Sequence, residues 1–294
     1  MSDIGKQIPE SGNGPGSAPV SGGRGGGWLA VALWTITLAV FWPAVRWLLS
    51  VTLDQRQLLQ AFVVFGFSGL LLILGDSRLK AVWRFETGSI RGLFASYVLV
   101  GLAMGLGSPH LILAALCIAI WAAVRFIYGD VARRGSLWVV LAFGLYLFFI
   151  VAMPFFDWPL RILSGRFAAW VLDIMGKHVQ LFVVLRPEPS LMLLMGDRVF
   201  EVAAECNGFG LLSSSCLLAL VLAGASTSPW IIRTAKWIGC AALGFGANIV
   251  RIVVICLLSG WAGQTHYHTM HEVVGTACVV AALGAVWWLW RRRV

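Results

Sequence analysis

Eight apolar segments, each close to the length that a membrane-crossing helix needs, dominate this chain of 294 residues. Short polar stretches separate most of them, so each segment predicts a helix that crosses a bilayer. The hydrophobic share of 59% and the mean hydropathy of +0.85 are typical of an integral membrane protein. The sequence therefore predicts an all-α polytopic membrane protein with about eight transmembrane helices, over residues 28–50, 58–75, 91–107, 111–129, 137–156, 207–224, 237–259 and 271–290.

The first 27 residues differ from the rest in composition. They contain nine glycines together with serine and proline, and few large apolar side chains. Such a segment cannot bury enough apolar surface to offset the entropy that is lost on ordering. We expect a disordered cytoplasmic tail over residues 1–27 and an integral membrane domain over residues 28–294.

The basic residues predict how the helices are oriented. The net charge of +9 comes mostly from short loops between apolar segments, which indicates membrane topology and not nucleic-acid binding. Because positively charged loops stay in the cytoplasm, both termini are predicted to be cytoplasmic. The residues that carry this prediction are Arg78, Lys80, Arg84, Arg91, Arg133, Arg134, Arg233, Lys236, Arg291, Arg292 and Arg293.

The longest segment between predicted helices, residues 157–206, is then on the outer side. From Pro159 to Ile174 apolar residues recur at three- and four-residue steps, which predicts an amphipathic helix on the outer leaflet. Short apolar runs separated by turn signals then predict a β-hairpin-like sheet with an edge to which an extended peptide can add. Its strands are expected at Val179–Leu185, Ser190–Met195 and Arg198–Ala203.

Three reactive or charged side chains fall on this same outer side. Cys206 precedes the sixth helix, Arg251 is about two-thirds of the way along the seventh, and His271 opens the eighth. A thiol, a base and a fixed positive charge are the parts of a cysteine acyl-transfer site. The other five cysteines lie inside apolar segments, where we interpret them as packing residues. We therefore predict that Cys206, Arg251 and His271 are catalytic.

Each of these candidates also has a structural interpretation. An arginine inside a membrane costs about 2.5–3.5 kcal/mol even on the lenient insertion scale. An ion pair with Glu201 or Glu205 would offset that cost and make Arg251 structural. His271 would then be an ordinary interfacial residue, and Cys206 a packing residue like the others.

The polar neighbours are candidates for substrate binding or for support of the site. Glu205 directly precedes the cysteine, and Gly208 permits a close approach of the backbone. Asn207 either caps the sixth helix or donates to an oxyanion. Asn248 lies three residues before Arg251, so both face the same side of a helix.

Histidines before the last helix permit a metal-site interpretation. His266, His268, His271 and Glu272 form a cluster of residue types that bind zinc. Their spacing matches no standard zinc motif, so we predict neither a metal nor a cofactor.

Three short motifs resemble those of the exosortase/archaeosortase family. They are Ala204–Gly208 (A-x-C-x-G), Asn248–Ile252 (N-x-x-R-I) and His271–Gly275 (H-x-x-x-G), each at a predicted helix. With the eight-helix layout and the outer segment before the cysteine, the resemblance extends over residues 28–290. The family often has serine where this chain has Asn207.

The resemblance implies a membrane cysteine protease or transpeptidase that cleaves C-terminal sorting signals of the PEP-CTERM kind from exported, membrane-anchored proteins. It implies Cys206 as the nucleophile that forms a thioester, His271 as the acid/base and Arg251 as the stabilising cation. It also implies a bacterial inner-membrane protein whose site faces the periplasm. The alternatives are a transporter or channel in which Arg251 binds the substrate, and a structural membrane protein.

Overall fold

The computed structural model describes residues 25–75, 83, 86–129, 133–185, 189–203, 206–259 and 267–291. The chain divides after Ala39 into two compact units, and helix α1 (Gly25–Asp54) contributes to both. Residues 1–24 of the predicted tail lie outside the described residues, and α1 begins three residues before the predicted position 28. The second unit, residues 40–294, contains all the other elements.

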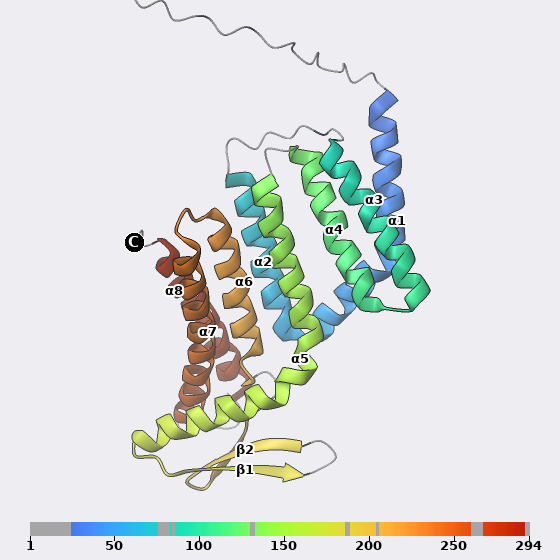
Figure 1. Ribbon diagram of the computed structural model, residues 1–294. Helices are drawn as coiled ribbons and strands as arrows, with labels where there is room; N and C mark the ends of the chain where they lie inside the picture. The colour runs from blue at the N-terminus through green and yellow to red at the C-terminus, as the bar shows by residue number, and fades with distance from the viewer. Residues whose placement is uncertain are drawn as a thin grey trace, which may run out of the picture. The chain divides into compact units, whose positions relative to one another are not determined.

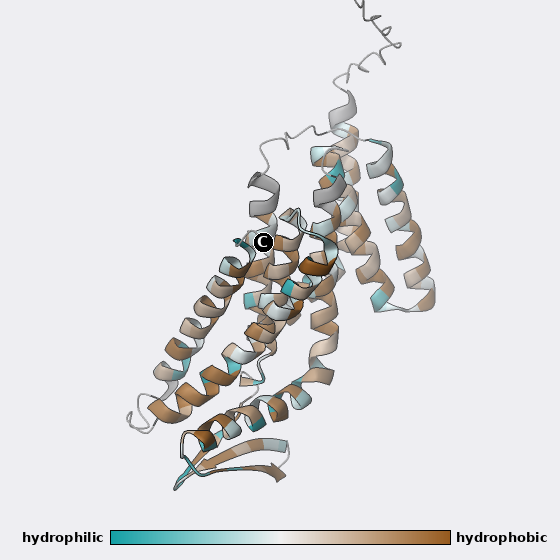
Figure 2. Ribbon diagram, turned by 60° about the vertical axis from the view of Figure 1, so that its left-hand side comes forward, coloured by the Kyte–Doolittle hydropathy of each residue, from teal (hydrophilic) through white to brown (hydrophobic). Residues whose placement is uncertain are grey.

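The predicted apolar segments are all helical. Helices α2 to α4, α6 to α8 and the first half of α5 run side by side as a bundle (Figure 1). Apolar residues extend along these helices (Figure 2). Their bounds are α2 (Arg56–Gly75), α3 (Thr87–Leu106), α4 (Pro109–Tyr128), α5 (Arg133–Ile174), α6 (Phe209–Ala225), α7 (Trp230–Leu258) and α8 (Tyr267–Arg291).

Six helices in the described part of the chain are long and apolar enough to cross a membrane, namely α1, α3, α4, α5, α7 and α8. The remaining two are shorter over their described apolar stretches, Leu58–Leu70 in α2 and the whole of α6. The chain is thus a multi-pass membrane protein. The predicted count of eight membrane-spanning helices is confirmed only in part.

Helix α6 is the central helix of this bundle. It contacts α2, α5, α7 and α8, and 12 of its 17 residues are buried. Small residues let α7 approach it closely, because a Cβ atom at Gly244 would lie 2.7 Å from the carbonyl oxygen of Leu211. A helix of 17 residues is about 26 Å long. The end of this enclosed helix is where the cysteine motif begins.

Helix α5 differs from the prediction. The sequence predicts a membrane helix that ends near residue 156 and a separate amphipathic helix from Pro159 to Ile174, whereas the structure has one helix of 42 residues. Pro154 and Pro159 both lie inside it. Each proline removes one backbone hydrogen bond and crowds the preceding turn, so the helix bends instead of ending. Its second half crosses beneath the ends of the neighbouring helices (Figure 1).

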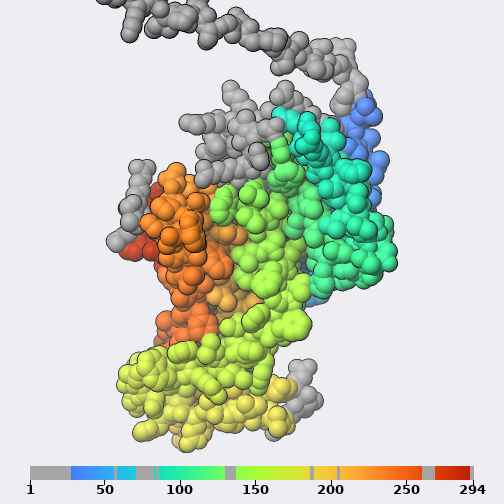
Figure 3. All heavy atoms as spheres, viewed as in Figure 1, coloured from blue at the N-terminus to red at the C-terminus, as the bar shows by residue number. Residues whose placement is uncertain are grey.

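A three-stranded antiparallel sheet lies against this second half of α5. The strands are β1 (Val179–Leu185), β2 (Pro189–Met195) and β3 (Arg198–Glu201), paired in the order β1-β2-β3. The strand predictions are confirmed to within two residues, and Gly196, at a φ of +61°, makes the turn between β2 and β3. The space-filling view shows the sheet and the second half of α5 as one layer across the end of the bundle (Figure 3).

An apolar core joins this layer to α7. Its buried residues come mainly from the second half of α5, from β2 and from α7, and Cys206 belongs to the same cluster. Arg198 of β3 also donates a 2.6 Å hydrogen bond to the carbonyl oxygen of Ser259, just after α7. These contacts fix the outer layer against the helix that carries Arg251. The core consists of Ala168, Leu172, Leu191, Leu193, Val202, Cys206, Ile252, Val253 and Cys256.

Candidate active site

Cys206 lies between the sheet and the first turn of α6. Its side chain is only 6% exposed, and its backbone N–H donates to the carbonyl oxygen of Ala203 at 2.9 Å. Gly208 then turns the chain into α6 with a φ of +85°, a conformation that L side chains rarely adopt. A Cβ atom at Gly208 would lie 2.8 Å from the amide nitrogen of Asn248, so the predicted close approach is present.

Asn248 of α7 holds the backbone of the cysteine. Its Nδ2 donates to the carbonyl oxygen of Cys206 at 2.8 Å and to the hydroxyl of Ser164 at 3.2 Å. The Ser164 hydroxyl donates in turn to the carbonyl oxygen of Asn207 at 3.2 Å. Asn248 and Ser164 are both fully buried. The two peptide groups that follow Cys206 are therefore fixed by side chains from α5 and α7.

Asn207 caps α6. Its Oδ1 accepts a 2.8 Å hydrogen bond from the backbone N–H of Phe209, and its amide nitrogen donates to Asp157. The Asp157 carboxylate also pairs with Arg161 at 2.6 Å. Of the two roles that the sequence leaves open for Asn207, these contacts favour the cap, because the amide nitrogen that would donate to an oxyanion is directed to Asp157.

The sequence analysis missed Asp157 and Ser164. Both lie on the second half of α5, seven residues apart, and Arg161 lies between them. Residues at i, i+4 and i+7 share one face of a helix, so these three polar residues form a stripe among apolar neighbours. That stripe was the available signal, and it indicates a polar partner for this face of α5.

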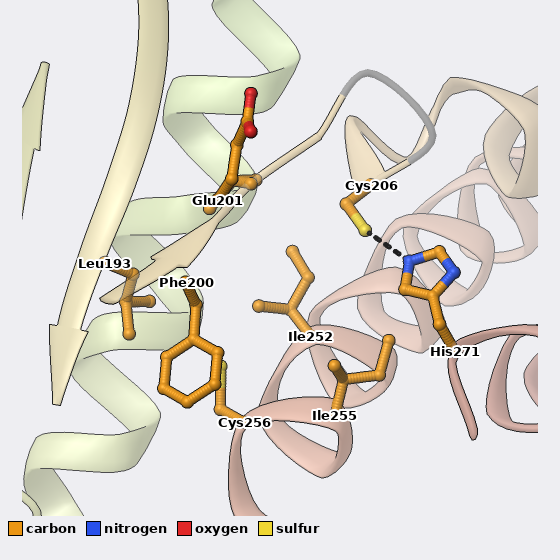
Figure 4. A pocket seen from close by; sticks show the side chains of 9 residues that line it. Leu193, Phe200, Glu201, Cys206, Ile252, Ile255, Cys256 and His271 are labelled. Atoms are coloured by element: carbon orange, nitrogen blue, oxygen red, sulfur yellow. Dashed lines mark hydrogen bonds between the residues drawn. The ribbon is translucent and has the colours of Figure 1, made fainter. Parts of the chain in front are cut away.

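The thiol and the imidazole are in contact. The Sγ atom of Cys206 lies 3.3 Å from Nε2 of His271, which lies in the first turns of α8 (Figure 4). A guanidinium nitrogen of Arg251 lies 3.5 Å from the same Nε2. Guanidinium groups only donate, so a hydrogen bond from Arg251 uses the lone pair of Nε2 in the tautomer whose proton is on Nδ1. In that tautomer the same lone pair lies 3.3 Å from Sγ and can accept the thiol proton instead.

Gly275 provides room for the guanidinium. It lies four residues after His271 and on the same face of α8. A Cβ atom at this position would lie 3.1 Å from a guanidinium nitrogen of Arg251 and 3.2 Å from its central carbon. The glycine therefore lets the cation lie against the α8 backbone, next to the imidazole. This contact gives the H-x-x-x-G pattern a physical reason.

A small pocket adjoins the thiol. Its cavity volume is about 20 Å³, room for about one water molecule, and with the adjoining space that is open to solvent the empty volume is about 300 Å³. Glu201 lies at the pocket and is exposed, and within the described chain its carboxylate makes no ion pair with Arg251. The pocket is lined by Leu193, Phe200, Glu201, Val202, Cys206, Ile252, Ile255, Cys256 and His271.

Several predicted residues lie outside the described residues. Glu205 and His266 are among them, and so is the side chain of His268. The structure therefore does not test the ion pair between Arg251 and Glu205. It also does not test the alternative interpretation of the histidines as a zinc site. Within the described part of the chain, no group of three or more His, Cys, Asp or Glu residues is arranged to hold a metal ion.

The three predicted catalytic residues thus converge from separate elements at one end of the bundle. A family model described as transmembrane exosortase matches residues 85–288, well over half of the chain, and the match contains Cys206, Arg251 and His271. No curated protein and no solved structure matches the chain. The family match shows that the chain belongs to the transmembrane exosortases, a family of cysteine-dependent membrane proteases and transpeptidases.

Proposed function

We propose that this protein cleaves C-terminal sorting signals of exported, membrane-anchored proteins by acyl transfer to the thiol of Cys206. The observation that carries the proposal is the 3.3 Å contact between Sγ of Cys206 and Nε2 of His271, beside the guanidinium of Arg251. A thiol next to an acceptor nitrogen and a fixed cation is the arrangement that nucleophilic acyl transfer needs.

The first step forms the thioester. Nε2 of His271 accepts the thiol proton, and the Sγ electron pair attacks the scissile carbonyl carbon. The carbonyl oxygen then carries the negative charge, which Arg251 stabilises together with the positive end of the α6 dipole. The imidazolium returns its proton to the leaving amine, and the carbon–nitrogen bond breaks. The products are a thioester on Cys206 and the released C-terminal segment.

The second step removes the acyl group. An incoming amine or water gives up a proton to His271 as it attacks the thioester, and the thiol leaves with that proton. With an amine the outcome is transpeptidation, and with water it is hydrolysis. The other polar residues act on geometry, since Asn248, Ser164 and Asn207 hold the backbone that follows the thiol-bearing residue.

The proposed substrate is anchored by an apolar helix, and this agrees with the place of the site. Cys206 lies at the end of the bundle that the sheet and α5 cover, so a chain leaving the bilayer there passes beside the thiol. We propose that this end faces the periplasm of a bacterial inner membrane and that both termini are cytoplasmic.

Support for that orientation comes from the opposite end. There Arg233 lies 5.8 Å from the ring of Trp138, Lys236 lies 5.5 Å from the ring of Trp290, and Arg291 packs over Trp287. Arginine and lysine in short segments at one end of a helical bundle are typical of the cytoplasmic side of a membrane protein.

A processing assay tests this function. A membrane-anchored substrate that ends in a short motif, an apolar helix and a basic tail is produced with wild type or with a variant, and its cleavage is followed. We expect Cys206→Ala and Cys206→Ser to abolish cleavage with unchanged membrane insertion. Cys216→Ala and Cys240→Ala serve as controls and remain active, since both thiols are buried in packing contacts. Cleavage by Cys206→Ala would disprove the nucleophile assignment.

A further inference from the structure

The pocket beside Cys206 lies between two structural elements. One wall consists of residues from β2 and β3, and the other wall consists of residues from α7 (Figure 4). The thiol and the imidazole close one end of it. The pocket therefore starts at the reacting sulfur and extends away from it, between the sheet and the membrane helix.

The lining of this pocket is apolar in its interior. Leu193, Ile252 and Cys256 have exposed fractions of 0%, 4% and 2%. Apart from His271, the one charged side chain among the lining residues is Glu201, which is exposed at the mouth. An apolar group that enters gains by leaving water, whereas a charged group loses its hydration and finds no partner inside.

The position of the thiol determines which part of the substrate enters the pocket. When Sγ bonds to the scissile carbonyl carbon, the α-carbon of the same residue is directly attached to that carbon. The side chain of this residue is therefore held next to Sγ in both the tetrahedral intermediate and the thioester. Space beside the sulfur is available in this pocket.

We propose, on the basis of the function proposed above, that this pocket binds the side chain of the substrate residue that supplies the scissile carbonyl. The pocket selects an uncharged, apolar side chain at that position, and Glu201 at its mouth disfavours an acidic one. Cys256 and Ile252 form the buried part of the α7 wall, which we call the floor of the pocket, and determine the size that is accepted.

Substrate variants test the preference of the wild type. The cleaved bond is first located by mass spectrometry of the product, and the residue on its carbonyl side is then changed to Ala, Leu, Asp or Lys. We expect the apolar residues to be cleaved at least tenfold faster than Asp, measured as relative kcat/KM in competition. Equal cleavage of all four substrates would overturn the inference.

Enzyme variants test which residues cause this preference. Cys256→Leu fills the floor and should lower the Leu-to-Ala ratio of kcat/KM by roughly 10–200-fold, the range for one methylene in an apolar pocket. Glu201→Lys replaces an exposed carboxylate and should raise the Asp-to-Ala ratio by about two- to tenfold. Because Glu201 is exposed, this variant tests the pocket even if the floor variant does not fold.

The matched control is Asp197→Lys, which makes the same charge change in the turn between β2 and β3 and does not line the pocket. It should leave both ratios unchanged. One outcome would overturn the proposed role of the pocket and leave the proposed function intact. In that outcome cleavage requires Cys206, but the kcat/KM ratios are the same in Glu201→Lys, in Asp197→Lys and in wild type. Cleavage that does not require Cys206 would overturn both.

Discussion

The amide of Asn248 donates a 2.8 Å hydrogen bond to the carbonyl oxygen of Cys206, so α7 holds the backbone of the thiol-bearing residue. Arg251 follows on the same helix, nearly one turn further along. One rigid element thus sets the position of both the cysteine and the cation. The motif N-x-x-R therefore connects two parts of the site that the sequence separates by more than forty residues.

Asn248→Ala should lower Cys206-dependent processing strongly. It removes the donor to Cys206 and leaves a buried carbonyl oxygen without this partner, which costs roughly 1–3 kcal/mol of stability. Because a displacement of about 1 Å can cost on the order of 10²-fold in rate, we expect a loss of about that size. The measurement is substrate turnover at matched expression, together with the rate at which iodoacetamide alkylates Cys206.

Ser164→Ala is the graded control for this prediction. It removes the second acceptor of the Asn248 amide and the donor to the carbonyl oxygen of Asn207, but leaves the hydrogen bond to Cys206. Its loss of turnover should be clearly smaller than that of Asn248→Ala. Equal losses in the two variants would indicate that the network acts on stability alone and does not position the thiol.

Gly208→Ala should be damaging for two separable reasons. A non-glycine residue at a φ of +85° is strained by about 1–3 kcal/mol, and the added methyl group would lie 2.8 Å from Nδ2 of Asn248. Gly176→Ala is the matched control, because Gly176 also has a positive φ, of +77°, but meets no atom within 4 Å. We expect both variants to lower the thermal unfolding temperature and only Gly208→Ala to lower turnover of the remaining folded protein.

Gly275→Ala should displace the guanidinium of Arg251. The new methyl group would lie 3.1–3.2 Å from three guanidinium atoms, so the cation has to move by a few tenths of an ångström. Gly284→Ala makes the same change two and a half turns later on α8, where nothing lies within 4 Å. Turnover should fall in Gly275→Ala and be unchanged in Gly284→Ala. Full activity of both would argue against a precise placement of Arg251.

The sequence predicted the elements of the fold well because their signals are local. Apolar segments of membrane length and short alternating runs placed the helices, and the starts and ends of β1 and β2, to within a few residues. The second half of α5 is the main error. A proline can end a helix or bend it, and only the packing of residues such as Leu172 against the sheet determines which occurs.

The end of the bundle at which the site lies was predictable, but its contacts were not. Position along each helix places Cys206, Arg251 and His271 at the same end of the bundle, where the structure brings them together. The partners of Asn207 and Asn248 depend on which helix faces lie together. Asp157 and Ser164 supply those partners from α5, about fifty and eighty residues away in sequence, and no single motif encodes that arrangement.

Topology reporters should confirm the proposed orientation. A cytoplasmic reporter fused after Arg293 or inserted within residues 225–236 should be active, and a periplasmic reporter inserted within residues 186–190 should be active. The physical reason is that the short loops predicted on the cytoplasmic side carry arginine and lysine, whereas the basic residues of the long segment 157–206 weigh little in that rule. The inverted pattern would put Cys206 on the wrong side for an exported substrate.

The final prediction separates the roles of Arg251 and His271. Arg251→Lys keeps the charge but loses the planar group that lies against Gly275 and reaches Nε2, so turnover should fall strongly without reaching zero. Arg251→Ala should lower turnover further, by on the order of the 10²–10³-fold that is lost when an oxyanion donor is removed. His271→Ala should be at least as damaging, because both thiol deprotonation and protonation of the leaving amine depend on it.

His266→Ala and His268→Ala are the controls, because they distinguish acyl transfer from a zinc site. If the site performs acyl transfer, both variants should lose much less turnover than His271→Ala, whose ring contacts the thiol at 3.3 Å. A zinc site would instead lose activity with any of the three histidines, since each would supply a ligand. Turnover is measured for all five variants at matched expression, with the metal content of purified wild type. Stoichiometric zinc together with equal losses in the three histidine variants would replace the cysteine mechanism with a metalloenzyme.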